Sequence, residues 1–261
     1  MDSLRGYSST SPLAARSLAA GRDVVGNEER QDNSETEEPP QTDLYSSGGD
    51  SEELDEDEER EEGERQEEEL LQDYPYWENP EAIQTLTALL EHLLPRSRRP
   101  EVRYDFLALD APIPFASSCT HGTVYFSRAM LETLSAESLR FYGAHEMAHT
   151  ELRHFATRRR RLDDLRRAMP APPGSPARQR MELAAVLAVR HQEEFEADTL
   201  AGQWTDRRAA ELALQELHQA CLRLCPESLS RPTHPPFPTR VECLLRGVPP
   251  DPVEYLWSLM R

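Results

Sequence analysis

Residues 141–154 read FYGAHEMAHTELRH, and the fold is expected to be organised around His145-Glu146-Met147-Ala148-His149 within this stretch. In a helix, His145 and His149 lie one turn apart and project from the same face. Two imidazoles in that arrangement can bind one Zn²⁺ ion. Glu146 follows the first histidine, close enough to take a proton from a water on the metal. The stretch therefore predicts a metal-binding helix.

A catalytic zinc site needs a third protein ligand and an open position for water. The pattern of the metzincin peptidases places glycine three residues and histidine six residues after the second histidine. Those positions hold Leu152 and Phe155, so that pattern is excluded. His154 lies one residue short of it and is expected to pack on the metal-binding helix or cap it.

A later helical stretch, HQEEFEADTLAGQW at residues 191–204, supplies a glutamate instead. Glu194 and Asp198 lie one helical turn apart. Glu194 can bind the metal, and Asp198 can orient a ligand histidine by accepting a hydrogen bond from its other ring nitrogen. Their neighbours Glu193 and Glu196 are expected on the solvated face of this helix.

Acidic residues are concentrated in the first part of the chain. The 261 residues carry a net charge of −19, and residues 1–73 hold 24 acidic against six basic side chains. Such a segment cannot bury enough apolar surface to offset its ordering entropy. We expect a disordered acidic arm over residues 1–73, with transient helix near 67–71, and a folded domain over residues 74–261. That domain is nearly neutral, which argues against nucleic-acid binding.

The hydrophobic pattern of residues 74–261 predicts a mostly helical α+β fold with a small β-sheet. A loop is expected over residues 111–122. Ser135 is the expected N-cap of one long helix that carries both histidines and runs to about Met169. The other helices are expected over 81–94, 127–134, 178–203, 206–224, 239–246 and 252–260, and the strands over 101–110 and 123–127.

The chain has four cysteines, and none of them forms a Cys-x-x-Cys pair. This pattern fits a reducing compartment. The N-terminus lacks the apolar segment of a secretory signal, and no stretch approaches the ~20 apolar residues of a membrane span. We therefore expect a cytoplasmic protein without a membrane span.

Three motifs occur in order along the chain: FYGAHEMAHTELRH, EFEAD at residues 194–198 and THPPFPTR at residues 233–240. Together they resemble the gluzincin metallopeptidases related to the CAAX prenyl endopeptidase and the heat-shock protease HtpX. The motifs of that family are His-Glu-x-x-His, Glu-x-x-x-Asp and His-Pro-x-x-x-x-Arg. The resemblance covers roughly residues 80–247 and is to the small soluble members of the family.

The resemblance implies a zincin-like metallopeptidase domain that binds one Zn²⁺ per chain and cleaves a peptide or protein substrate. His145, His149 and Glu194 would bind the zinc ion. Glu146 would act as the general base and then as the acid that protonates the leaving amine.

The same resemblance implies roles for residues around these ligands. Asp198 would orient a ligand histidine, and His234 would stabilise the oxyanion of the tetrahedral intermediate. Arg240 would anchor the loop of His234 or pair with a nearby carboxylate. The family often has asparagine on the strand that lines the substrate cleft, where this chain has Ile113. The substrate is expected to add a strand along TVYFS, residues 123–127.

Two other functions are compatible with the sequence. The chain could be a non-catalytic zinc-binding interaction protein, in which the acidic arm binds a partner. It could also be a regulatory metallopeptidase that cleaves a repressor. In the peptidase, the opposite charges predict that the arm folds over the basic stretch 158–167 and restricts substrate entry.

Overall fold

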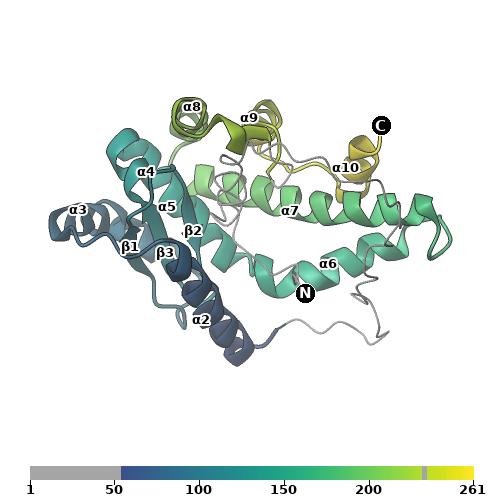
Figure 1. Cartoon of the computed structure of the whole chain (residues 1–261), viewed down its shortest axis with the longest axis horizontal. Coiled ribbons are helices and arrows are strands. Elements are labelled where there is room, and N and C mark those ends of the chain that lie inside the picture. The colour runs from purple at the N-terminus through teal and green to yellow at the C-terminus, as the bar shows by residue number, and fades with distance from the viewer. Residues whose placement is uncertain (1–53, 231–233) are drawn as a thin grey trace, which may run out of the picture.

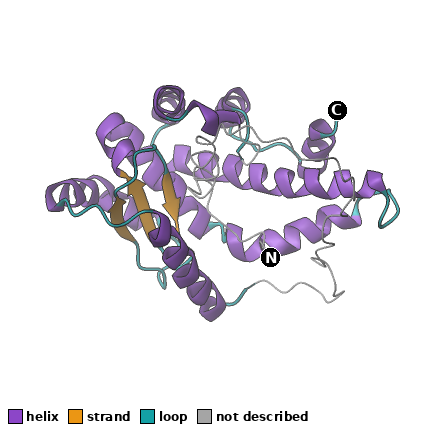
Figure 2. Cartoon of the chain, in the orientation of Figure 1, coloured by secondary structure: helices purple, strands orange, loops and turns teal. Residues whose placement is uncertain are grey.

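The computed structural model describes residues 54–230 and 234–261 (Figure 1). This part of the chain is mostly helical with one small sheet, so the predicted α+β fold is confirmed (Figure 2). No helix in it has the length and apolar character needed to cross a membrane. The elements are α2 (Glu56–Asp73), α3 (Pro80–Leu90), η2 (Glu91–Arg96), β1 (Asp105–Leu109), β2 (Ala116–Ser118), β3 (Thr123–Ser127), α4 (Arg128–Thr133), α5 (Ala136–Glu151), α6 (His154–Arg167), α7 (Pro176–Trp204), α8 (Arg207–Leu224), η3 (Pro226–Ser230), α9 (Phe237–Arg246) and α10 (Pro252–Leu259).

The sheet has the strand order β1-β3-β2, with β1 parallel and β2 antiparallel to the central strand β3. The predicted loop over 111–122 is therefore wrong at β2. This strand has only one alanine and two serines, which carry no strand signal. The prediction that a substrate pairs with TVYFS is also wrong, because β3 already has a partner strand on each side.

One face of the sheet packs against α3 and α5. Gly143 allows α5 to pack closely against α3, since a Cβ at this position would lie only 2.5 Å from Cδ2 of Leu90. The α5 helix is thus held firmly between the sheet and helices α7 and α8. The shared core includes Phe106, Val124, Phe126, Phe141 and Met147.

The helix α2 covers the other side of the sheet. The prediction of disorder over residues 1–73 is therefore wrong for residues 56–73. Asp55 begins this helix with a capping box, which satisfies backbone groups at its first turn. Leu70 is buried with Phe115 and Tyr125, and Gly63 lies so close to His121 that a Cβ would meet its ring at 2.3 Å. Tertiary packing therefore orders residues 56–73 despite their charge. The rest of the predicted arm, residues 1–53, lies outside the described residues.

The predicted long helix from Ser135 to about Met169 is broken in the structure. The α5 helix ends at Glu151, and Arg153 adopts a left-handed backbone conformation with φ of 50°. This conformation costs a non-glycine residue roughly 1–2 kcal/mol. The Arg153 side chain offsets the cost by pairing with Glu59 of α2, at 3.1 Å. Arginine favours helices, so the sequence carries no local signal for the break.

Two arginines of the basic stretch in α6 form ion pairs with α7. Arg158 and Arg161 pair with Glu193 and Glu196 of α7, at 2.8 and 2.7 Å. These pairs join α6 to α7, which lie side by side (Figure 1). The arm's ordered helix uses Glu59 to bind Arg99 and Arg153. Arg158 and Arg161 are thus paired with α7, and the contact between the arm and residues 158–167 stays a prediction.

Candidate metal centre

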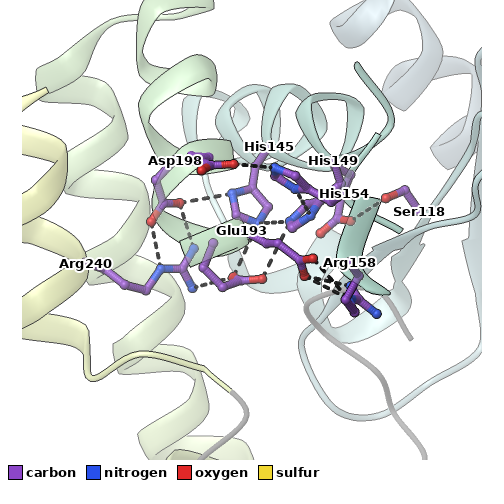
Figure 3. A network of polar contacts seen from close by, with 11 residues as sticks. Ser118, His145, His149, His154, Arg158, Glu193, Asp198 and Arg240 are labelled. Atoms are coloured by element: carbon purple, nitrogen blue, oxygen red, sulfur yellow. Dashed lines mark hydrogen bonds and ion pairs between the residues drawn. The ribbon is translucent and has the colours of Figure 1, made fainter. Parts of the chain in front are cut away.

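Helices α5 and α7 bring three metal-binding side chains together (Figure 3). The Nε2 atoms of His145 and His149 lie 3.2 Å apart. Nε2 of His145 lies 3.6 Å from Oε2 of Glu194, and Nε2 of His149 lies 3.6 Å from Oε1 of the same carboxylate. Four ligands at tetrahedral angles, each about 2.0–2.1 Å from a zinc ion, would be separated by about 3.3 Å. The three predicted ligands are therefore spaced as a single metal ion requires, and all three are buried.

Asp198 and Arg240 support one side of this centre. Nδ1 of His145 lies 3.0 Å from Oδ1 of Asp198, at hydrogen-bonding distance. Arg240 of α9 donates two hydrogen bonds to the carboxylate of Asp198, at 2.8 and 2.7 Å, and its Nη1 lies 3.6 Å from Glu194. Burial alone would raise the pKa of Asp198, but the charge and hydrogen bonds of Arg240 lower it to about 2. The carboxylate is thus ionised and available to the histidine.

A second support on the other side was not predicted. Nδ1 of His149 lies 2.9 Å from Nδ1 of His154, and Nε2 of His154 lies 3.1 Å from Oε2 of Glu196. The sequence predicts a solvated Glu196 and a packing or capping role for His154. The prediction for Glu196 is wrong, because α6 packs against this face of α7. The break at Arg153 is what allows His154 to turn back towards His149.

The two facing Nε2 atoms call for a cation between them. Burial by itself would lower the pKa of both histidines. For His145, the hydrogen bond and charge of Asp198 outweigh burial and raise the pKa, whereas the pKa of His149 falls well below its usual value. A divalent metal ion between the two Nε2 atoms would also be bound by Glu194, whose Oε2 accepts no hydrogen bond from the described residues.

Metal affinity is expected to rise steeply as the pH rises towards about 7. Burial raises the pKa of Glu194 to about 7, and the pKa of His145 lies above its usual 6.5. Both groups must lose their protons before they can bind a metal. Below both pKa values, each released proton gives a tenfold change per pH unit, or about 100-fold for two. Competition with a chromophoric chelator over this range measures the slope, and a flat profile would contradict the ligand set.

Glu146 lies beside the ligands where α5 meets the edge strand β2. Its side chain is fully buried, and Ser118 of β2 donates a hydrogen bond to its Oε2 at 3.0 Å (Figure 3). Ser118 was missed because it lies in the segment predicted to be a loop. The hydrogen bond fixes the position of the carboxylate next to His145. The group predicted as general base is therefore oriented by the edge strand β2.

His234 belongs to the same electrostatic environment. The side chain is half-buried, and burial together with the charges of Arg240 and His145 lowers its pKa to about 3. His234 is therefore neutral at pH 7 and retains one N–H that can donate a hydrogen bond. Nδ1 of His191 lies 2.9 Å from the Tyr255 hydroxyl.

A cavity of about 30 Å³ lies next to His149, between β2, α5, α6 and the first turn of α2. Glu59 and Arg153 are among the residues that line it. This volume holds about one water molecule and is too small for a peptide. Ile113, at the position of the family's asparagine, packs into the apolar cluster beneath α2 rather than at this cavity.

No protein-family model matches the chain, and a comparison with curated proteins finds no matching sequence. The resemblance to gluzincin peptidases therefore stays a prediction from the three motifs. The structure adds that residues of all three motifs meet: His145 and His149 of the first, Glu194 and Asp198 of the second, and Arg240 of the third. Such a centre offers two nitrogens and one oxygen to a metal ion, with a further carboxylate beside them.

Proposed function

We propose that the chain is a zinc-dependent endopeptidase. The observation that carries the proposal is the convergence of His145, His149 and Glu194, with Glu146 beside them on α5. Two imidazoles and one carboxylate are the ligand set of catalytic zinc sites that keep a position open for water. Structural zinc sites more often have four protein ligands and are rich in cysteine.

A bound Zn²⁺ would act as a Lewis acid that polarises the scissile carbonyl and lowers the pKa of water towards 7. Glu146 would take a proton from the attacking water and later deliver it to the leaving amine. Ser118 supports this role by holding the Glu146 carboxylate at 3.0 Å. Neutral His234 would donate its N–H to the oxyanion of the tetrahedral intermediate.

The edge strand β2 is the expected binding site for the substrate backbone. Within residues 54–230 and 234–261, β2 pairs with β3 on one side, and no strand pairs with its other side. A peptide could add there as a further strand, with its main chain beside Ser118 and Glu146. The α2 helix lies at the end of this edge, where Thr120 donates a backbone hydrogen bond to Gln66 at 3.2 Å. A bound peptide would therefore require α2 to shift.

The metal content of the purified protein tests the proposal. Wild type is expected to contain one zinc ion per chain. A Glu194→Gln variant is expected to bind zinc more than about 100-fold more weakly, because loss of a ligand exceeds the 10–100-fold typical of an outer partner. Glu193→Gln is the matched control, because the carboxylate of Glu193 accepts hydrogen bonds from Arg158 and is not one of the proposed metal ligands. Equal zinc content in the two variants would contradict the ligand assignment.

A non-catalytic zinc-binding interaction protein is the second candidate. It is favoured by the complete burial of Glu146 and by the small cavity that α2 leaves beside His149. Incubation of the zinc-loaded protein with a peptide library separates the two candidates. Cleavage supports the endopeptidase, whereas an intact library with one zinc bound per chain would support the second candidate.

We also propose that the protein acts in a reducing compartment such as the cytoplasm. The four cysteines have no Cys-x-x-Cys pair and no spacing typical of a disulfide framework, and three of them are buried in the structure. Few cysteines without such a framework are typical of a compartment in which thiols are kept reduced.

A further inference from the structure

We propose that His154 and Glu196 position His149 for metal binding by fixing which of its ring nitrogens carries the proton. The inference rests on the metal centre of the proposed function. It concerns two residues that none of the predicted roles includes. The structure assigns them to a chain of contacts that runs from α7 through α6 to the second histidine of α5.

The chain of contacts is built from buried, close-fitting groups. His154 is 1% exposed, and its two ring nitrogens lie 2.9 Å from His149 and 3.1 Å from Glu196. Glu196 is itself held by Arg161, at 2.7 Å, and by the side-chain amide of Gln192, at 3.1 Å. Oε2 of Glu196 therefore accepts from Arg161 and also faces His154, while Oε1 accepts from Gln192.

The direction of each hydrogen bond follows from the chemistry of Glu196. A carboxylate only accepts hydrogen bonds, so Nε2 of His154 must carry a hydrogen. Neutral His154 then has a lone pair on Nδ1, which can only accept a hydrogen from Nδ1 of His149. His149 is left with its lone pair on Nε2, the atom that faces His145 and Glu194. The pair thus prepares the nitrogen that a metal needs.

The break between α5 and α6 is what brings His154 into contact with His149. In a continuous helix, residue 154 would lie roughly 140° around the axis from residue 149 and could not reach its ring. The left-handed conformation of Arg153 redirects the chain so that the rings of His149 and His154 have centroids 4.8 Å apart. Arg153 is held in that conformation by Glu59. His145 needs no such device, because Asp198 reaches it directly from α7.

Two amide substitutions of His154 test the inference through zinc affinity. In His154→Asn, the amide oxygen can occupy the place of Nδ1 and accept from His149, so affinity close to wild type is expected. In His154→Gln, the amide reaches the place of Nε2 and leaves Nδ1 of His149 without its acceptor. Zinc is then expected to bind about 10–100-fold more weakly, as for other lost outer partners. Competition with a chromophoric chelator measures both.

A Glu196→Leu variant tests the outer member, because it removes the acceptor that fixes the hydrogen on Nε2 of His154. Reduced zinc affinity is expected, and long-range ¹⁵N–¹H NMR of His149 should lose the Nδ1–H signature that wild type and His154→Asn retain. Equal affinity in His154→Asn and His154→Gln, whether both weak or both strong, would overturn the inference alone. Absence of zinc binding by wild type would instead refute the proposed function, and the inference with it.

Discussion

A Glu146→Gln variant is expected to bind one zinc ion per chain and to cleave peptides about 10²–10⁴-fold more slowly than wild type. This factor is the usual contribution of a positioned general acid–base group. Glutamine has nearly the same shape but cannot take a proton from water. Ser118 can still donate its hydrogen bond to the amide oxygen, so the packing between α5 and β2 should survive. The loss would therefore report proton transfer rather than misfolding.

Glu137→Gln is the control for this variant, because it makes the same substitution in the exposed first turn of the same helix. It is expected to leave both zinc content and cleavage unchanged. The measurement is the single-turnover rate on a peptide that wild type cleaves, with zinc content determined on the same samples. Full cleavage by the Glu146 variant would exclude the proposed role of this carboxylate.

The ligands could be predicted because helical periodicity determines their relation. His145 and His149 are four residues apart on α5, and Glu194 and Asp198 are four residues apart on α7, so each pair shares a face once the helix forms. Short-range spacing of this kind is a property of the sequence itself. The pairing of Arg240 with Asp198 joins two helices, and its prediction depended on the family resemblance.

The features that the sequence did not predict, the contact of His154 with His149 and the helix α2, depend on tertiary contacts. His154 reaches His149 only because Glu59 of a distant helix holds Arg153 in a left-handed conformation. The α2 helix itself forms on a strongly acidic segment because the sheet offers Tyr125 and its neighbours as an apolar surface for Leu70. Composition predicted disorder there, since it measures average polarity and cannot detect a single well-placed apolar contact.

Replacement of Arg240 is expected to lower the free energy of unfolding of the zinc-free protein by about 3–5 kcal/mol, the usual cost of breaking a buried ion pair. Arg240 is 8% exposed and donates two hydrogen bonds to Asp198. An Arg240→Met variant would keep much of the side-chain volume and leave Asp198 and Glu194 without their shared cation. Urea unfolding at pH 7 with a chelator present measures the change.

The dependence of this loss on pH distinguishes a lost ion pair from lost packing. The pKa of Asp198 is lowered from its ordinary 3.8 to about 2, so its interaction with Arg240 stabilises the native state fully above pH 4. That stabilisation is lost as the pH falls towards 2, and the difference between variant and wild type should shrink over the same range. Arg246→Met, on the exposed side of α9, is the control and should change stability by less than about 0.5 kcal/mol. If Arg240→Met behaved like this control at pH 7, Arg240 would have no part in holding the centre together.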